Sequence, residues 1–312
     1  MPAMTTVEGL SKRGTITEIQ RYCIHDGPGI RTTVFLKGCN LRCFWCHNPE
    51  TLAREPELQV FPERCIDCGA CILACPCGAL ERTEAGKVLV RERCTGCGRC
   101  AAECFAEALV MVGHEVSAGE VLLEVLADRA FFQSSGGGVT LSGGEPLLQA
   151  EFSAALLSAC QADGIHTAIE TAGHVPWDRF ATVLPAVDLL MLDLKVMDCE
   201  LHRRVTGVSN ATILENAQRL GAGPLPLVIR IPVIPGVNDT AEAIGSIARF
   251  ASGLPALQHL ELLPFHPMAA GKYDSLGLTY SARSLARPSP ERMAALADVV
   301  ASFSVPVRAS SA

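Results

Sequence analysis

Short apolar runs alternate with helical stretches along the chain, and this alternation is the main indication of the fold. Six runs rich in β-branched and aliphatic residues predict strands at Thr32–Lys37, Val139–Leu141, His166–Ile169, Leu189–Leu194, Leu227–Ile231 and His259–Leu263. Amphipathic stretches predict helices at Glu151–Ala162, Trp177–Leu184, Thr212–Leu220, Thr240–Ser252 and Pro290–Ser302. Such an alternation is typical of parallel strands that are buried on both faces and joined by right-handed crossovers.

The number of strands limits the architecture. Six β/α units are too few for a closed barrel of eight strands. The predicted fold class is therefore α/β, an open partial (β/α)6 TIM-like barrel with an insert described below. Ser117 followed by Glu120 predicts a capping box that begins a further helix, and Thr15–Tyr22 predicts a short edge strand.

Between residues 56 and 112 the β/α alternation is interrupted, and one cysteine motif occurs twice. The repeated cysteines are Cys65, Cys68, Cys71 and Cys75, then Cys94, Cys97, Cys100 and Cys104. Each copy matches the bacterial ferredoxin run, in which three cysteines hold one cluster and the fourth reaches the other. We therefore expect two [4Fe–4S] clusters, with Cys104 completing the first set and Cys75 the second; zinc is the alternative for either. Phe105 stands where a proline usually follows the last cysteine.

This repeat divides the chain into three segments. Residues 1–55 would form the first part of the barrel, residues 56–112 the ferredoxin-like insert, and residues 113–312 the remainder of the barrel. Cys77 is a spare thiol that could substitute as a ligand, although a small buried hydrophobe is the favoured interpretation. The same interpretation applies to Cys23, Cys160 and Cys199.

Composition and charge restrict the function. The 312 residues are 49% hydrophobic and 19% charged, which suits a packed core, and the net charge of -7 gives no basic footprint for nucleic acid. Met1–Leu10 lacks a secretory pattern, and no apolar run approaches the roughly 18 residues of a membrane span. Twelve of the fifteen cysteines lie between Cys39 and Cys104, which favours iron–sulfur ligation in a reducing cytoplasm over disulfides.

A further cysteine array directly follows the first predicted strand. Cys39, Cys43 and Cys46 have the spacing C-x3-C-x2-C. Zinc and [4Fe–4S] clusters usually take four protein ligands, so three cysteines imply either a distant fourth ligand or an iron left open to bind a small molecule. The open iron is the catalytic interpretation, and a structural zinc site is the alternative.

Polar residues follow or interrupt the other predicted strands. They are Ser142, Gly143, Gly144 and Glu145, then Glu170 and Thr171, then Asp193 and Lys195, then Arg230, and finally His266. The carboxyl ends of parallel strands carry the chemistry in α/β folds. We therefore expect one polar pocket that faces the cysteine trio and suits a charged, nucleoside-like ligand.

Together these motifs resemble the glycyl-radical-enzyme activating enzymes of the radical S-adenosylmethionine (SAM) superfamily. The matching segments are Asp26–Arg31, the cysteine trio, the tandem ferredoxin runs, Ser142–Glu145, Asp193–Lys195 and Leu263–His266. More narrowly, they resemble the branch that carries a two-cluster insert. The resemblance covers roughly Thr15–Tyr273.

The resemblance implies roles for individual residues. The open iron held by Cys39, Cys43 and Cys46 would chelate SAM, and the Gly143–Glu145 loop would support the SAM amino group. Lys195, Arg230 and His266 match positions that line the SAM and substrate site, with Lys195 and His266 among the catalytic residues. A monovalent-cation site would be formed by Glu170, Thr171, Met191 and Asp193, and Glu170 stands where an aspartate is familiar.

The resemblance also implies an activity. One of three [4Fe–4S] clusters would reduce SAM to methionine and a 5′-deoxyadenosyl radical, which removes a hydrogen from a glycine of a partner glycyl radical enzyme. A flavodoxin or ferredoxin-type protein would donate the electron, and we expect a monomer. One alternative is a radical SAM enzyme that acts on a small molecule or another peptide. A second is an electron carrier whose clusters are all ferredoxin-like, which would leave the trio unexplained.

Overall fold

The computed structural model describes residues 7–84 and 86–309. Residues 1–6, part of the Met1–Leu10 stretch without a predicted secretory signal, lie outside this description. No helix in the described part of the chain is long and apolar enough to cross a membrane.

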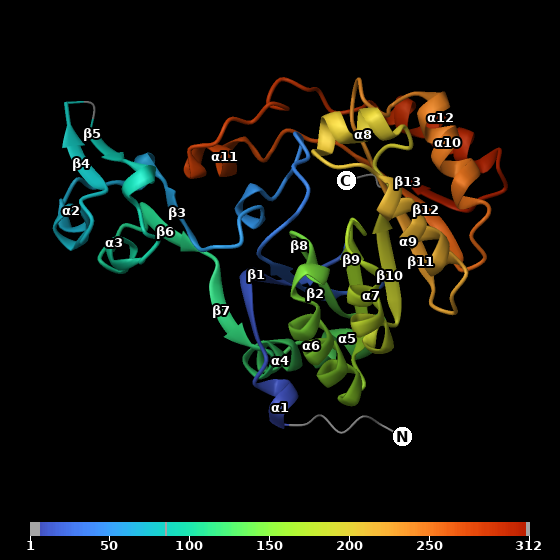
Figure 1. Cartoon of the computed structure of the whole chain (residues 1–312), viewed down its shortest axis with the longest axis horizontal. Helices are drawn as coiled ribbons and strands as arrows, with labels where there is room; N and C mark the ends of the chain where they lie inside the picture. Colours follow the sequence, from blue (N-terminus) through green and yellow to red (C-terminus); the bar gives the residue numbers. More distant parts are fainter. Residues whose placement is uncertain (1–6, 85, 310–312) are drawn as a thin grey trace.

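A nine-stranded sheet forms the centre of the larger part of the molecule (Figure 1). Its order is β13-β12-β11-β10-β9-β8-β2-β1-β7. The six predicted strands are present as β2 (Arg31–Leu36), β8 (Gly138–Gly143), β9 (His166–Thr171), β10 (Leu189–Asp193), β11 (Leu227–Val233) and β12 (Leu257–Pro264). They lie side by side in chain order, and every neighbouring pair is parallel. The chain is thus mixed α/β with a mainly parallel sheet.

Three more strands extend this sheet at its ends. They are β1 (Arg13–Cys23), β7 (His114–Ser117) and β13 (Val307–Ala309). β1 runs antiparallel to β2, and β7 runs antiparallel to β1. The strand predicted at Thr15–Tyr22 is thus present within β1, but it is not the outermost strand, because β7 pairs with Arg13–Ile16. The chain that returns from the insert pairs with the outer side of β1, and a local pattern of residues carries no information about that distant segment.

The predicted helices are all present. They are α6 (Ala150–Ala162), α7 (Trp177–Val183), α9 (Ala211–Gly221), α10 (Ala241–Ala251) and α12 (Pro290–Ala301). α4 (Ala118–Leu126) begins with the predicted capping box, in which the Ser117 hydroxyl accepts from the Glu120 N–H and the Glu120 carboxylate accepts from the Ser117 N–H. Helices α1 (Val7–Leu10), α5 (Arg129–Ser135), α8 (Cys199–Thr206) and α11 (Ala270–Leu276) were not predicted. They are too short to show a clear period.

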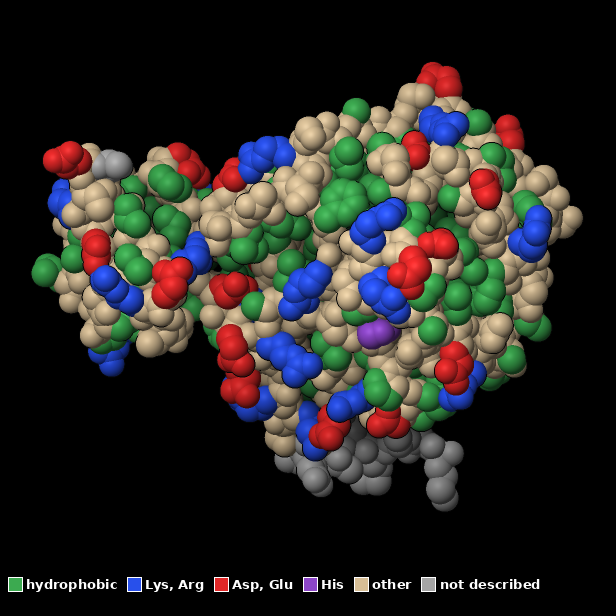
Figure 2. Space-filling view, turned by 45° about the horizontal axis from the view of Figure 1, so that its top comes forward, with side chains coloured by type: hydrophobic (Ala, Val, Ile, Leu, Met, Phe, Trp, Pro, Cys, Tyr) green, Lys and Arg blue, Asp and Glu red, His purple; other side chains and the backbone are tan. Residues whose placement is uncertain are grey.

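The segment between residues 56 and 112 forms a separate lobe (Figures 1 and 2). Its elements are β3 (Glu57–Val60) paired with β6 (Leu109–Val112), β4 (Leu80–Thr83) paired with β5 (Gly86–Leu89), and the short helices α2 (Ala70–Ala74) and α3 (Arg99–Ala102). A small core of its own includes Leu58, Leu80 and Leu109. Basic and acidic side chains are interspersed on the face shown in Figure 2.

Five single-turn 3-10 helices complete the elements. They are η1 (Pro49–Thr51), η2 (Pro62–Arg64), η3 (Arg91–Arg93), η4 (Pro146–Gln149) and η5 (Leu184–Ala186). η1 lies just beyond the cysteine trio and contacts α11.

Polar contacts on two sides fix the insert to the rest of the chain. The Lys37 ammonium is fully buried at the end of β2, where it donates to the Glu50 carbonyl at 2.7 Å and pairs with the Glu57 carboxylate at 2.9 Å. On the other side, Arg91 donates to the Ser275 carbonyl at 3.1 Å, and Gln59 donates to the Ser275 hydroxyl at 3.1 Å. β3 is therefore held between the end of β2 and α11.

A buried carboxylate, Asp128, ties the first two strands to the start of α5 and gives a prediction about stability. It accepts hydrogen bonds from the Arg21 guanidinium at 2.8 and 2.9 Å and from the Thr32 hydroxyl at 2.6 Å. Hydrogen bonds to a charged group contribute about 1.5–3 kcal/mol each. We expect Asp128→Asn to lower the free energy of unfolding by at least about 1.5 kcal/mol, measured by anaerobic urea denaturation. The exposed Glu124→Gln is the matched control; equal stability of the two variants would contradict this account.

Candidate active site and cluster sites

The loop that carries the cysteine trio is anchored by backbone hydrogen bonds on two sides. Gly38 and Cys39 donate to the Thr51 and Leu52 carbonyls at 2.8 and 3.2 Å. Arg42 donates to the Thr206 carbonyl at the end of α8 at 2.7 Å. Trp45, within the loop, is buried in an apolar cluster that includes residues of α11. The positions of Cys39, Cys43 and Cys46 are thus set by elements far apart in the sequence.

The environment of these three thiols suits a metal cluster. Burial raises the pKa of Cys39 to about 11, of Cys43 to about 12 and of Cys46 to about 11. At neutral pH such thiols keep their protons unless a metal replaces them, because thiolate is the ligating form. Three partly buried sulfur donors on one short loop fit a [4Fe–4S] cluster that has one iron without a protein ligand.

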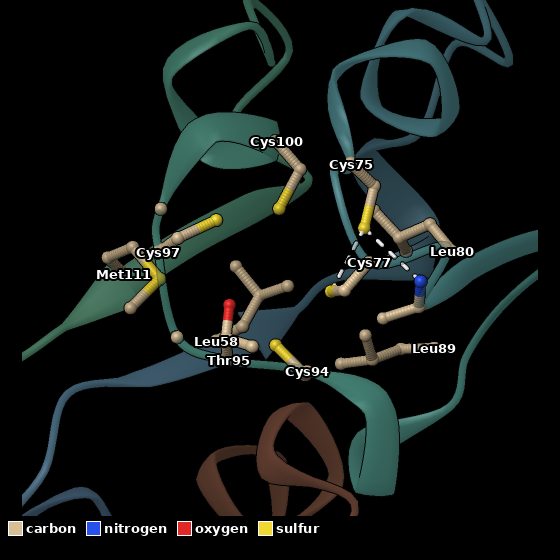
Figure 3. Close-up of a pocket in the computed structure, with 13 residues that line it drawn as sticks. Leu58, Cys75, Cys77, Leu80, Leu89, Cys94, Thr95, Cys97, Cys100 and Met111 are labelled. Carbon is tan, nitrogen blue, oxygen red and sulfur yellow. Dashed lines mark hydrogen bonds between the residues drawn. The ribbon is translucent and has the colours of Figure 1, made fainter.

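The insert brings its eight repeated cysteines together as two groups. A cavity of about 480 Å³ is lined by Cys65, Cys68, Cys71 and Cys104, which we call the outer set. A second, smaller cavity is lined by Cys75, Cys94, Cys97 and Cys100, which we call the inner set (Figure 3). Each set takes three cysteines from one run and one from the other, as the spacing predicts. The four thiol donors of each set fit one cluster.

The spare cysteines do not behave alike. Cys23 and Cys160 are buried, in agreement with the sequence interpretation, whereas Cys77 and Cys199 are only partly buried. Cys199 contacts the Ser209 hydroxyl at 3.2 Å. Cys77 lines the same cavity as the inner set. This cavity is also lined by apolar residues such as Leu58 and Leu89, so the role of Cys77, as a ligand or as a small hydrophobe, stays a prediction.

The glycine pair after β8 packs directly against the cysteine loop. Gly143 has a φ of 107°, and a side chain there would meet the Leu36 backbone at 2.5 Å. A side chain at Gly144 would meet the Gly38 carbonyl oxygen at 2.2 Å. Only glycine allows this approach. The next residue donates its own N–H to the Gly38 carbonyl at 2.8 Å, so the two loops form one unit.

Glu145 itself points into the protein. It is fully buried, and its carboxylate accepts from the Thr171 hydroxyl at 2.7 Å, the Ala172 N–H at 3.0 Å and the Leu147 N–H at 3.1 Å. Burial raises the pKa of Glu145 to about 7, even though these donors favour the charged form. Both oxygens already have partners, so pairing of this carboxylate with an ammonium group stays a prediction.

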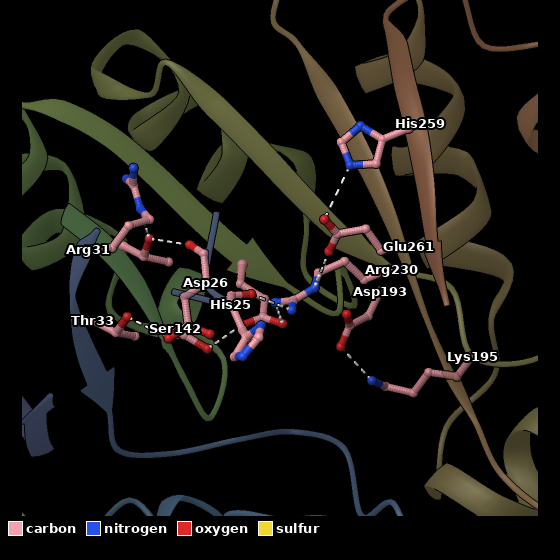
Figure 4. A network of polar contacts seen from close by, with 12 residues as sticks. His25, Asp26, Arg31, Thr33, Ser142, Asp193, Lys195, Arg230, His259 and Glu261 are labelled. Carbon is pink, nitrogen blue, oxygen red and sulfur yellow. Dashed lines mark hydrogen bonds and ion pairs between the residues drawn. The ribbon is translucent and has the colours of Figure 1, made fainter. Parts of the chain in front are cut away.

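Opposite charges alternate across neighbouring strands at the predicted pocket (Figure 4). Arg230 pairs with Glu170 of β9 at 2.6 Å and with Glu261 of β12 at 3.1 Å. Asp193 of β10 pairs with Lys195 at 2.7 Å. Arg230 also donates to the His25 carbonyl at 2.9 Å, which brings the Asp26–Arg31 motif to the same place. The structure thus brings together predicted polar residues of three strands, β9, β10 and β11, with Glu261 of β12 beside them.

Burial decides the protonation of these groups. It raises the pKa of Glu170, and the charge of Arg230 opposes that shift. Burial lowers the pKa of Lys195, but Asp193 and Cys43 outweigh it, so the net shift is upward. Glu170 and Asp193 are thus each paired with a basic side chain. A monovalent cation held by these two carboxylates with Thr171 and the buried Met191 stays a prediction.

His266 lies at the end of β12 and stacks on His47, with 4.0 Å between the ring centroids. Burial lowers the pKa of both rings, that of His47 to about 4, so both are neutral at neutral pH. In the described part of the chain His47 Nε2 and His266 Nδ1 are buried without a hydrogen-bond partner. Sequence reasoning missed His47 and Glu261. Two sequence features could have identified them: His47 directly follows Cys46, and Glu261 is a charged residue inside an apolar strand.

Family models agree with this geometry. A model of the radical SAM superfamily matches residues 91–250. A model described as a 4Fe-4S dicluster domain matches residues 57–105, and one described as a 4Fe-4S single cluster domain matches residues 25–67. The last range contains the cysteine trio.

Curated relatives indicate which branch of the radical SAM superfamily the chain resembles. The chain is 46% identical to the isethionate sulfite-lyase activating enzyme of Desulfovibrio desulfuricans (strain ATCC 27774 / DSM 6949 / MB), over 85% of this chain and 87% of that protein. It is also 46% identical to the benzylsuccinate synthase activating enzyme of Thauera aromatica, over 84% of this chain and 81% of that protein. The chain belongs to the glycyl-radical-enzyme activating enzymes. Like other members of this radical SAM family, this activating enzyme uses [4Fe–4S] clusters and SAM.

A solved structure shares the fold of this activating enzyme. Streptococcus suis SuiB bound to precursor peptide SuiA matches with a TM-score of 0.50 and 13% sequence identity, over 87% of this chain and 46% of that chain. At this level of identity the likeness concerns the arrangement of helices and strands.

The buried Glu145 gives a prediction about pH. Its pKa is about 7 in the folded protein and 4.5 when unperturbed, so the folded state holds more protons than the unfolded state between these values. Stability then decreases as the pH rises through this window. We expect the midpoint temperature of anaerobic thermal unfolding without SAM to decrease when the pH is raised from about 5.5 to about 7. This decrease should be smaller in Glu145→Gln. The exposed Glu151→Gln should keep the wild-type slope; identical slopes in all three proteins would contradict this account.

Proposed function

We propose that this activating enzyme binds three [4Fe–4S] clusters, one at the trio and one at each insert set, and removes a hydrogen from a glycine of its partner glycyl radical enzyme. One observation carries this proposal. The three partly buried thiols of the trio lie on a loop that contacts the glycine pair at the end of β8, beside the charged strand ends that include Lys195 and Arg230. A ligand bound at this place meets sulfur donors, backbone groups and both signs of charge.

The chemistry of the cofactor is simple to state. When bound, the trio's cluster supplies one electron to the SAM sulfonium, and methionine and a 5′-deoxyadenosyl radical result. The chain's own residues position and shield the ligand. Gly143 and Gly144 leave backbone groups accessible beside the cysteine loop, and Glu145 holds that loop to β9 through Thr171 and Ala172. Lys195 and Arg230 offer positive charge to a carboxylate, while Asp193 and Glu170 keep both basic groups in place.

His47 and His266 complete the pocket in this proposal. Each has a buried ring nitrogen that finds no partner among the described residues. An unpaired buried polar atom is costly unless a ligand or water satisfies it. The neutral, stacked imidazoles present a flat surface with hydrogen-bonding edges, which suits a nucleoside.

The sheet is, in this proposal, the open partial (β/α)6 barrel of the family. Its end strands, β13 and β7, lie at opposite ends of the strand order. An open side allows a glycine loop of the partner to approach the strand ends. We also propose residues 1–55 and 113–312 as the two parts of this barrel and residues 56–112 as the insert, which agrees with the separate sheets and core of the lobe.

The two cysteine sets of the insert take different places in electron transfer. Arg91, three residues before Cys94 of the inner set, donates to the Ser275 carbonyl of α11 at 3.1 Å. Tyr273 of the same helix packs in the apolar cluster that contains Trp45 of the trio's loop. We therefore place the inner cluster next to the trio. Cys65, Cys68, Cys71 and Cys104 would hold the outer cluster, which would accept the electron from a flavodoxin or ferredoxin-type donor.

The partner enzyme is not singled out by similarity. Two relatives with the same 46% identity are named for different enzymes, an isethionate sulfite-lyase and a benzylsuccinate synthase. The features that this chain shares with both define the activating chemistry. Choice of partner must then depend on residues outside those shared features.

The proposal predicts that Cys43→Ala removes one cluster and abolishes SAM cleavage. The full chain, reconstituted anaerobically, should hold about twelve iron atoms, and Cys43→Ala about eight, because one site of three loses its ligand set. After reduction, wild type should convert SAM to methionine and 5′-deoxyadenosine, measured by chromatography. Its electron paramagnetic resonance (EPR) spectrum should also change when SAM is added.

Cys199→Ala is the matched control, since this thiol lies outside the three cysteine groups. It should keep the iron content and SAM cleavage of wild type. If Cys43→Ala retained all its iron and its response to SAM, the trio would not be the SAM site, and the proposed function would fail.

A further inference from the structure

The inner cysteine set has one thiol too many. A [4Fe–4S] cluster takes four protein thiolates. The inner cavity is lined by five cysteines, because Cys77 joins Cys75, Cys94, Cys97 and Cys100. In Figure 3 the sulfur atoms of all five are turned toward the same space. Cys77 is therefore placed as a donor to whatever occupies that space.

The distance between Cys75 and Cys77 matches that of two ligands of one metal. Their sulfur atoms are 3.7 Å apart. Two thiolates bound to one tetrahedral metal, with bonds of about 2.3 Å, lie about 3.8 Å from each other. Both sulfurs can therefore reach the same iron position without a change in the backbone. Pro76, which separates the two cysteines, restricts that backbone further.

Three irons of the inner cluster would each have a fixed cysteine ligand, so only the ligand of the fourth iron can vary. Cys94, Cys97 and Cys100 come from a single run that leads into α3. Cys75 and Cys77 come from the opposite side of the cavity, after α2. Cys75 accepts a hydrogen bond from the Ala79 N–H at 3.2 Å, which stabilises a thiolate there. The first run thus offers two thiols for the one iron that the second run leaves without a ligand.

We propose that Cys77 is an alternative fourth ligand of the inner cluster, in exchange with Cys75. This inference rests on the inner set holding a [4Fe–4S] cluster, as proposed above. In the exchange the iron–sulfur bond to Cys75 breaks, the bond to Cys77 forms, and one proton passes from the Cys77 thiol to the Cys75 thiolate. No electron is gained or lost. The cluster can then keep all four irons when one of the two ligands is absent.

The outer set supplies an internal comparison. In the second run the residue two positions after Cys104 is Ala106, where the first run has Cys77 after Cys75. The outer cavity is lined by Cys65, Cys68, Cys71 and Cys104, with no fifth cysteine among its lining residues. Ligand exchange is therefore confined to the inner set, which faces α11 and the active site.

The test uses the full chain, reconstituted anaerobically, as wild type, Cys75→Ala, Cys77→Ala, Cys75→Ala/Cys77→Ala and Cys104→Ala. Iron is counted per chain. EPR of the oxidised protein detects three-iron clusters, which form when a cluster iron lacks its thiolate; because the trio's open iron lacks one in every variant, the three-iron signal is measured as the increase over wild type. We expect each single change at the first run to keep about twelve irons without a three-iron signal. The double variant and Cys104→Ala should both show that signal and lose about one iron or more per chain.

A three-iron signal in Cys75→Ala as strong as in the double variant would overturn the proposal, because Cys77 would then supply no bond. The same signal in Cys77→Ala would also overturn it, because Cys77 would be an obligatory ligand and not an alternative one. The SAM-dependent EPR change of the trio's cluster reports whether each variant is folded. Wild type with only about eight irons, and the same count in Cys75→Ala/Cys77→Ala, would instead show that the inner set holds no cluster, a failure of the cluster proposal itself.

Discussion

Burial of three thiol groups on one short loop is the constraint on which the site depends. The loop has little regular structure and is held by hydrogen bonds to η1 and α8. The same burial that positions Cys39, Cys43 and Cys46 raises their pKa to about 11 or 12. Only a bound metal makes them thiolates at neutral pH. Occupation by the cluster and final ordering of the loop are therefore linked.

Charge balance across neighbouring strands follows from this burial. A site that excludes water cannot contain an unpaired charge without a large cost. The parallel register places Asp193 opposite Arg230, and Arg230 opposite Glu261, so acids and bases alternate from β10 to β12. The pocket is therefore close to neutral before a ligand enters. A zwitterionic ligand can then exchange one ion pair for another instead of introducing a new charge.

The sequence predicted what depends on local pattern. Apolar runs such as Leu227–Ile231 located the parallel strands, and cysteine spacing located the two insert groups. It failed where distant segments meet. The pairing of β7 with β1, and the stacking of His47 on His266, each join residues about a hundred positions apart or more. The direction of the Glu145 carboxylate could not be predicted either, because it is set by Thr171 and Ala172 of the next strand.

The insert is held in place by residues that also border the loop of the cysteine trio. Lys37 ends the strand that leads into the trio, and its buried ammonium holds Glu57 at the start of β3. A buried ion pair of this kind is costly to break, because either partner alone would leave an unpaired charge. α11 provides the second contact, through Ser275, next to the helix residue Tyr273 that packs beside Trp45. The same two elements that contact the trio's loop thus also hold the insert, so the position of the inner cysteine set depends on the folding of that loop.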